Sequence, residues 1–342
     1  MVKDYKKALL IGSLVLLCLI TVACEDHPFF TNSTTKEKKD NNSPESLNNR
    51  QSQREVDEET EPSALQVPAY THVERPEHFY IQIEPNLLEP VSLNKAFETF
   101  QSLEKATKKE VKKELSELGF PDKQKLDNPG AQLNENELSL VYYALTKVKN
   151  NQYQNWFNVE ESEGFLFGGL YEYTHGAVQV DYVTDPETKE AIFEHYIKVD
   201  DPSRSQSPSF FINYLVRDGR VYQIYDPATN SAGNLFPFPF GIAPTRMILP
   251  YDVKVGNTWE QEVKVNEETY KMVSEITGKP KDEIHVTSFI NGIEGYPDNR
   301  YKEEYVLKKG MGIPYEYRSN LTDNMGTDFE FKFVKEQPVQ IQ

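Results

Sequence analysis

The chain has 342 residues, of which 37 are basic and 54 are acidic, and its formal net charge is −17. So negative a chain repels polyanions, which argues against binding to nucleic acid. The length admits one large domain or two smaller ones. The two cysteines, Cys18 and Cys24, both lie near the start of the chain, so the sequence offers no disulfide framework.

The first 23 residues have the pattern of an export signal. Lys3, Lys6 and Lys7 precede a mostly apolar stretch from residue 8 to residue 23. The apolar stretch is shorter than the roughly 20 residues needed to cross a bilayer, and the acidic pair Glu25 and Asp26 follows it. We therefore expect a signal that is cleaved rather than a permanent transmembrane helix.

The end of this stretch, Ile20-Thr21-Val22-Ala23-Cys24, resembles the lipobox of bacterial lipoproteins, although that family usually has Leu where Thr21 stands. The resemblance implies cleavage before Cys24 and attachment of diacylglyceryl and acyl chains to this cysteine. It also implies a location on the extracytoplasmic face of the cell membrane. The alternative is an ordinary secretory signal in which Cys24 is incidental. Removal of residues 1–23 leaves 34 basic and 53 acidic residues, and hence a formal charge of −19.

Composition divides the rest of the chain into a tether and a domain. Residues 24–64 are mostly polar, and we expect them to be a disordered tether, because they cannot bury enough apolar surface to offset the entropy of ordering. Residues 65–342 are rich in Tyr and Phe and predict the extracytoplasmic domain. A division into a helical part, 65–160, and a β part, 161–342, is also open.

The domain is predicted to begin with one strand and two helices. Residues 78–84 alternate in the manner of a half-buried strand. Apolar positions at helical spacing run from Leu93 to Leu118, and Gly119-Phe120-Pro121 then ends the helix. A second amphipathic helix begins near Asn134 or Asn136 and runs to Asn150.

Beyond Gly164 the apolar period changes to two, and Asp218-Gly219 marks the clearest hairpin turn. We predict an α+β fold dominated by a large antiparallel β meander, a curved sheet or half-barrel, with the two helices packed on it. The expected strands are 165–173, 177–183, 191–199, 210–217, 220–225, 246–251, 258–265, 270–276, 284–289, 301–307, 313–318 and 329–334.

Signatures of catalysis are absent or poorly placed. Ser102 and Lys105 have Ser-x-x-Lys spacing but lie within a predicted helix, and no Gly-x-Ser-x-Gly occurs. The six histidines lack metal-binding spacing, so we expect no metal and no cofactor. A glycosidase-like carboxylate pair remains open, because acidic residues are abundant. The acids in question are Glu160, Glu161, Glu163, Glu267, Glu268, Glu303 and Glu304.

Two features are candidates for ligand binding. Phe236, Phe238 and Phe240 are separated by prolines, which predicts a loop that is either tucked into the core or exposed as an apolar patch. Tyrosines are frequent on the predicted strands, and on one sheet face they would hold a sugar or an amphiphile. They are Tyr171, Tyr173, Tyr182, Tyr196, Tyr214, Tyr222, Tyr225, Tyr301, Tyr305, Tyr315 and Tyr317.

Two later stretches, residues 250–259 and 305–312, resemble β-rich bacterial envelope lipoproteins, without implying an activity. The sequence favours a membrane-anchored, non-enzymatic protein that binds a lipid or glycan or maintains the envelope. A glycan-directed envelope hydrolase that uses a carboxylate pair is one alternative. A structural or assembly partner of another envelope protein is the other.

Overall fold

The computed structural model describes residues 65–67, 93–159, 163–169, 174–200, 209–225, 241–243, 245–265, 268–322 and 328–341. The chain divides into two compact units, Met1–Asp57 and Glu58–Gln342, and every described residue belongs to the second. The predicted export signal, Cys24, the predicted strand 78–84 and the run from Phe236 to Phe240 lie outside the described residues.

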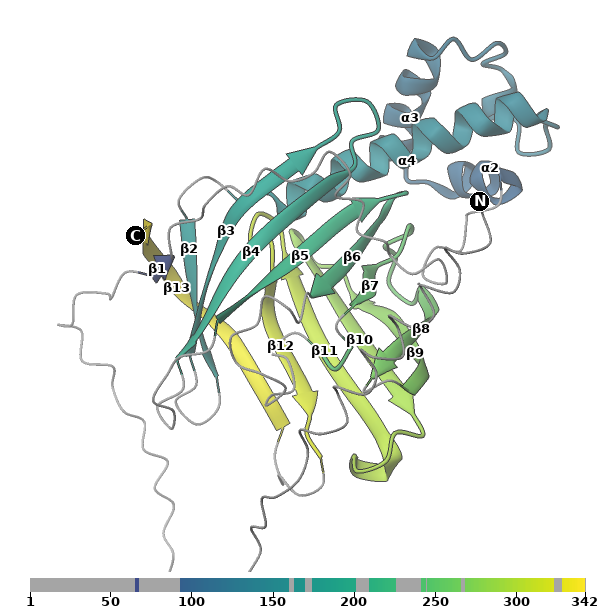
Figure 1. Cartoon of the computed structure of the whole chain (residues 1–342). Coiled ribbons are helices and arrows are strands. Elements are labelled where there is room, and N and C mark those ends of the chain that lie inside the picture. Colours follow the sequence, from purple (N-terminus) through teal and green to yellow (C-terminus); the bar gives the residue numbers. More distant parts are fainter. Residues whose placement is uncertain are drawn as a thin grey trace, which may run out of the picture. The chain divides into compact units, whose positions relative to one another are not determined.

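The sheet is antiparallel and nearly closed, as the alternating sequence predicts (Figure 1). Each of the twelve predicted strands is present, with ends that differ by up to four residues except in β13, which continues to Ile341 instead of ending at residue 334. They are β2 (Glu163–Gly169), β3 (Thr174–Thr184), β4 (Ala191–Asp200), β5 (Ser209–Arg217), β6 (Arg220–Tyr225), β7 (Thr245–Leu249), β8 (Thr258–Val265), β9 (Glu268–Gly278), β10 (Glu283–Asn291), β11 (Arg300–Lys308), β12 (Pro314–Asn320) and β13 (Asp328–Ile341).

The order of the strands splits the sheet into two meanders. The N-terminal half is β2 to β7, the C-terminal half is β8 to β13, and each half follows chain order. β13 pairs with β2 and joins the halves, so the two end strands of the sheet are β7 and β8, in the middle of the sequence. A short strand that was not predicted, β1 (Leu65–Val67), runs parallel to the end of β13.

Among the described residues, three α-helices precede the sheet: α2 (Leu93–Ser102), α3 (Lys105–Glu117) and α4 (Glu135–Phe157). The first predicted helix is therefore two helices. Between Leu103 and Val111 the sequence has no large apolar residue. A continuous helix would therefore have no large apolar side chain to pack against its neighbour over this stretch. The break lets α2 and α3 both pack on α4 around Phe100, Leu115 and Leu145. Asn134 and Glu137 form a capping box that fixes the start of α4.

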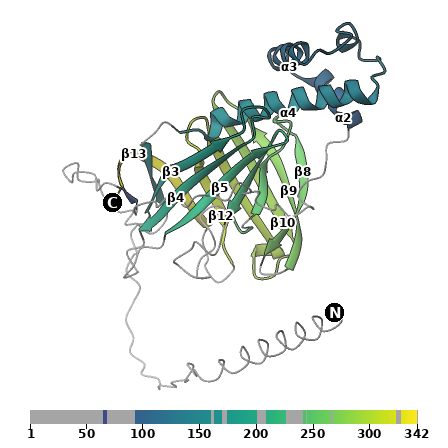
Figure 2. The same ribbon diagram turned by 45° about the horizontal axis from the view of Figure 1, so that its top comes forward.

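Helix α4 lies across one end of the sheet (Figures 1 and 2) and binds the turns that meet there. Asn150 donates to Thr188 O in the β3–β4 turn at 3.0 Å and accepts from Gly219 N in the β5–β6 turn at 2.8 Å. Asp218 and Gly219 both have positive φ, as the predicted tight hairpin requires. Trp156 O accepts from two amides of the β11–β12 turn. The main core fills the space between the two halves and includes Phe157 of α4, Tyr214 of β5 and Leu307 of β11.

Candidate functional site

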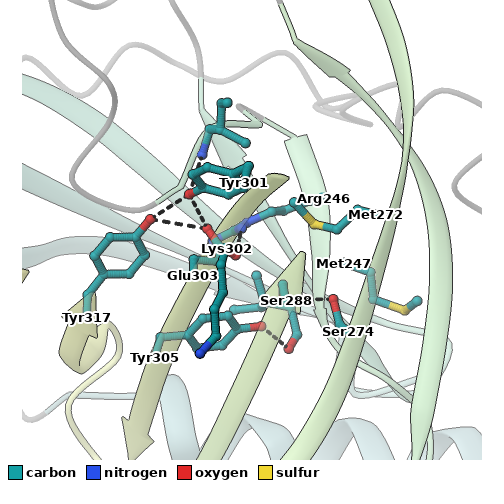
Figure 3. Close-up of polar contacts among 12 residues, drawn as sticks. Arg246, Met247, Met272, Ser274, Ser288, Tyr301, Lys302, Glu303, Tyr305 and Tyr317 are labelled. Carbon is teal, nitrogen blue, oxygen red and sulfur yellow. Dashed lines mark hydrogen bonds and ion pairs between the residues drawn. The ribbon is translucent and has the colours of Figure 1, made fainter. Parts of the chain in front are cut away.

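A buried polar cluster lies inside the sheet and spans both halves (Figure 3). The Glu303 carboxylate pairs with the Arg246 guanidinium through Oε1 and accepts hydrogen bonds from Tyr301, at 2.7 Å, and Tyr317, at 3.1 Å, through Oε2. The two tyrosine hydroxyls are also 2.9 Å apart. Tyr305 donates to Ile248 O at 2.8 Å and so links β11 to β7.

Strand alternation places these side chains. Tyr301, Glu303 and Tyr305 are every second residue of β11, and all three are buried. Tyr317 lies on the neighbouring strand β12, whereas Arg246 reaches the cluster from β7 in the other half. From the sequence, Glu303 was only one of many candidate acids, and Arg246 was missed. The sequence signal that could have revealed Glu303 is the alternation of the strand, which puts Glu303 on the same face as Tyr301 and Tyr305.

The end of the β6–β7 connection packs against this cluster. Ile242 N donates to the Tyr301 hydroxyl at 3.2 Å. Gly241 has a φ of +113°, and a Cβ atom there would lie 2.5 Å from Arg246 Cζ. Only glycine therefore fits this backbone conformation and this close approach to the guanidinium. Gly241 and Ala243 are buried, so this end of the proline-rich run, 235–242, is tucked into the interior.

Arg246 stays charged and the tyrosines of the cluster stay neutral at ordinary pH. Burial acts to lower the pKa of Arg246, but the Glu303 carboxylate and the surrounding tyrosines outweigh it, and the pKa is raised. Burial, followed by the charge of Glu303, raises the pKa of Tyr301 and of Tyr317. The tyrosines therefore remain protonated donors to an ion pair, and they are poorly suited to exchanging protons with a substrate.

The buried carboxylates of the described residues do not form the pair that a glycosidase needs. Among them only two carboxylates are buried, Glu137 and Glu303. Glu137 belongs to the capping box of α4 and pairs with Lys125 at 2.8 Å. Glu303 and Glu304 are successive strand residues and point to opposite faces of the sheet. Glu160, Glu161 and Glu267 lie outside the described residues, as does the side chain of Glu163.

A seam separates the end strands β7 and β8. The Gln261 side chain of β8 accepts from Met247 N at 2.7 Å and donates to Met247 O at 2.8 Å, so its amide takes the place of a strand backbone. Beside the seam is a groove of about 1090 Å³. It is lined on the helical side by Lys95, Thr99 and Ser102 of α2, and elsewhere by residues that include Arg220, Tyr251, Asp252, Asn257, Trp259, Glu262 and Tyr270.

The wall of this seam groove contains buried polar atoms without hydrogen-bond partners. Tyr251 and Trp259 are each 8% exposed. Neither the Tyr251 hydroxyl nor Trp259 Nε1 has a hydrogen-bond partner in the described part of the chain. Such buried atoms are uncommon in proteins and often mark a place where a water or a ligand binds.

The structure describes only some of the predicted site residues. Cys24, Phe236, Phe238 and Phe240 lie outside the described residues, as do Tyr171 and Tyr173. The other strand tyrosines do not share one face: Tyr196 and Tyr222 are buried on the outer face, whereas Tyr214, Tyr305 and Tyr317 point into the core. Two histidines, His175 and His195, are buried. Within the described ranges no group of His, Cys, Asp or Glu is arranged to hold a metal ion, and no helix is long and apolar enough to cross a membrane.

No family model matches the chain, and no curated protein matches it. The structure is similar to the crystal structure of a "putative lipoprotein" from Parabacteroides distasonis, with a TM-score of 0.33 and 8% sequence identity. The match covers 53% of this chain and 98% of that chain. A likeness this distant leaves the function to be argued from the residues themselves.

Proposed function

We propose that this protein is a membrane-anchored lipoprotein of the bacterial envelope that binds a glycan in the seam groove. Its anchor is Cys24, modified after removal of residues 1–23, and its folded part lies on the extracytoplasmic face. The basic start, the short apolar stretch and the small residue before the cysteine support the anchor. Two acyl chains suffice for stable attachment without a transmembrane helix.

The seam groove is the observation that carries the binding proposal. Its volume of about 1090 Å³ is close to the upper end of the sizes of ligand pockets. Its wall combines the aromatic rings of Tyr251, Trp259 and Tyr270 with charged and amide side chains. A ligand with hydroxyl groups could accept from Tyr251 and Trp259, whose buried polar atoms have no hydrogen-bond partner among the described residues.

The mixed lining favours a glycan over a lipid chain. Aromatic rings offer apolar faces to the C–H groups of a sugar, while Asp252, Asn257 and Arg220 are suited to its hydroxyl groups. A lipid chain would instead cover these polar side chains with hydrocarbon, which costs free energy.

The interior cluster supports a non-enzymatic role. Glu303, the buried carboxylate inside the sheet, is engaged by Arg246, Tyr301 and Tyr317, so it is not poised to protonate or attack a substrate. An arrangement of this kind favours a defined packing of the two halves. The interior cluster therefore gives the hydrolase alternative no support.

The anchor is tested by metabolic labelling with a palmitate analogue. The unaltered chain should incorporate the label and stay with the membrane fraction, whereas Cys24→Ala should lose the label. Equal labelling of both proteins would remove the anchor from the proposal.

Binding is tested by titrating the chain that starts at residue 25 with soluble disaccharide-peptide fragments of peptidoglycan, followed by NMR. Tyr270→Ala in the groove should weaken binding at least tenfold, whereas Tyr315→Ala, on β12 and outside the groove lining, should leave it unchanged. Phospholipid vesicles serve as the comparison ligand. Binding to vesicles alone, or equal binding by both variants, would contradict the glycan proposal.

A further inference from the structure

Two buried polar atoms in the wall of the seam groove, Trp259 Nε1 and the Tyr251 hydroxyl, restrict what a ligand must offer. Neither has a hydrogen-bond partner among the described residues. The indole N–H of Trp259 can donate a hydrogen bond but cannot accept one. Burial raises the pKa of the Tyr251 hydroxyl, which therefore stays protonated at ordinary pH and can donate as well. Only an acceptor on the ligand satisfies Trp259, and an acceptor also satisfies Tyr251.

Both residues belong to the end of the groove that is next to α2. Lys254 Nζ donates to Ser102 O of α2 at 3.4 Å, and Asn257 Nδ2 donates to Asp252 O at 2.5 Å. These contacts bring the segment 251–259 beside α2. We call this the helix end of the groove, formed by Lys95, Thr99, Ser102, Arg220, Tyr251, Asp252, Asn257 and Trp259.

Positive charge gathers at the helix end, although the chain as a whole has a formal charge of −17. Lys95 and Arg220 both line the groove there. Asp252 is the acid among these lining residues, and Lys254 pairs with it at 3.0 Å. The charge of Asp252 is thereby offset by a lysine outside the lining, and the cations of the lining keep an excess.

A further cation lies behind the wall. The ammonium group of Lys149, on α4, is over the Tyr251 ring, 5.9 Å from the ring centroid. Burial lowers the pKa of Lys149; Asp252 acts to raise it, and the cations Lys279 and Lys254 lower it further. These lysines therefore repel one another, and an anion bound at the helix end would reduce that repulsion.

The opposite end of the groove has the other sign. Glu260 and Glu262 of β8 line it together with Lys271 of β9. Lys271 forms an ion pair with Glu260 and is opposite Glu262 in the strand register. One cation there faces two carboxylates, all on exposed side chains. An anionic group is therefore attracted to the helix end and repelled from this one, which gives a ligand a direction in the groove.

We propose that the seam groove binds an acidic glycan, with its anionic group at the helix end beside Tyr251, Trp259 and Arg220. The neutral part of the sugar then extends along the groove towards Tyr270. This assignment rests on the proposed glycan function and specifies the class of glycan. A carboxylate and a phosphate ester both supply charged acceptor oxygens. A neutral hydroxyl group also accepts a hydrogen bond, but it leaves the positive charge of the helix end without an opposite charge.

Matched pairs of sugars separate the effect of charge from that of shape. The carboxylate probe is N-acetylglucosaminyl-N-acetylmuramic acid, compared with its methyl ester. The phosphate probe is N-acetylglucosamine 6-phosphate, compared with N-acetylglucosamine. Titration calorimetry on the full-length mature protein should show that at least one acid binds tenfold or more tightly than its neutral counterpart. The pair that shows the larger ratio identifies the anion, and the ratio should fall at high salt.

The neutral sugars keep this test apart from the test of glycan binding itself. Equal affinity for the acid and the neutral sugar in both pairs would overturn the assignment and leave glycan binding in place. If none of the four sugars binds, the glycan proposal fails, and the assignment fails with it.

Removal of one charge tests where the anion lies. Lys95→Gln changes an exposed side chain of the helix end and should lower the preference for the acid over its neutral counterpart at least threefold. Lys109→Gln removes the same charge from an exposed position of α3 outside the groove lining and should leave the preference unchanged. An equal preference in the two variants would contradict the placement of the anion.

Removal of one hydroxyl group gives a readout that a purely structural role would not produce. Tyr251→Phe keeps the ring and should weaken binding of the acid at least tenfold, because a hydrogen bond to a charged acceptor is lost. Its melting temperature should not fall, because the hydroxyl has no partner among the described residues. Tyr142→Phe, outside the groove lining, is the control and should bind the acid as the parent does. Unchanged binding by a folded Tyr251→Phe variant would overturn the assignment.

Discussion

The two halves of the sheet differ in the burial and polarity of the side chains on their outer faces. In the C-terminal half, β8, β10 and β11 alternate regularly between buried and more exposed residues, and their outward side chains are largely polar or charged. In the N-terminal half, residues 210 and 212–216 of β5 and residues 221–225 of β6 are buried on both faces, Phe211 being half-buried. A sheet with one polar face needs one core, whereas a sheet that is apolar on both faces needs cover on each.

The same contrast is visible in the sequences of single strands. Thr258-Trp259-Glu260-Gln261-Glu262-Val263-Lys264-Val265 of β8 alternates charged with buried residues, whereas Phe210-Phe211-Ile212-Asn213-Tyr214-Leu215-Val216 of β5 is nearly continuously apolar. The first pattern predicts a half-buried strand and the second a strand buried on both sides. A continuously apolar strand in an antiparallel sheet therefore predicts that both of its faces are covered.

The largest expected effect concerns the ion pair that joins the halves. Arg246→Met leaves the buried Glu303 carboxylate without its counter-charge and should lower the free energy of unfolding by about 3–5 kcal/mol. Urea denaturation of the chain starting at residue 25 measures this. The double variant Arg246→Met with Glu303→Leu should recover most of the loss, because no charge then remains buried. A single variant as stable as the parent would show that the pair does not connect the halves.

The next effect tests the outer faces directly. Leu215→Ala, at 1% exposure in the N-terminal half, should cost about 2–5 kcal/mol, as expected for a buried leucine. Thr287→Ala at the outer face of the C-terminal half should change stability by no more than about 0.5 kcal/mol. Equal effects in the same denaturation assay would remove the distinction between the two faces.

The seam between the halves should show a smaller effect. Gln261→Ala removes both hydrogen bonds to the Met247 backbone and should cost about 1–3 kcal/mol. Hydrogen exchange at Met247 N should become faster, because its acceptor is lost. Gln261→Glu retains an acceptor for Met247 N but puts a buried carboxylate oxygen against Met247 O, so it should not restore the stability of the parent. Unchanged exchange in Gln261→Ala would mean that the side chain does not hold the seam.

The smallest expected effect is the change in the free energy of unfolding per pH unit that the buried histidines of the N-terminal half cause. Burial lowers the pKa of both His175 and His195 to about 3, so the unfolded state binds protons first as the pH falls below its value of about 6.5. Each histidine should therefore remove stability by about 1.4 kcal/mol per pH unit between about pH 6 and pH 3, and stability should rise with pH in this window. Denaturation at pH 7, 6 and 5 measures the slope, which His175→Phe should reduce. His285→Gln, at a more exposed position of the C-terminal half, is the matched control.

Local patterns in the sequence determined the elements of this protein. Period-two alternation and turn residues predicted each of the twelve strands of the two meanders, and the Asp218-Gly219 hairpin is confirmed. Helical spacing predicted the helical segments but missed the break after Ser102, because the apolar period there fails for only two turns. These features depend on neighbours within a few residues, which is the range over which a single sequence carries a strong signal.

The tertiary structure alone decided how distant segments meet. The pairing of β2 with β13, the seam between β7 and β8, and the ion pair of Arg246 with Glu303 join residues far apart in the chain. No periodicity encodes such partners, because many strands of similar composition could pair equally well, and closure of the sheet selects among them. The candidate groove lies at this seam, so its position followed from the order of the strands and not from any motif.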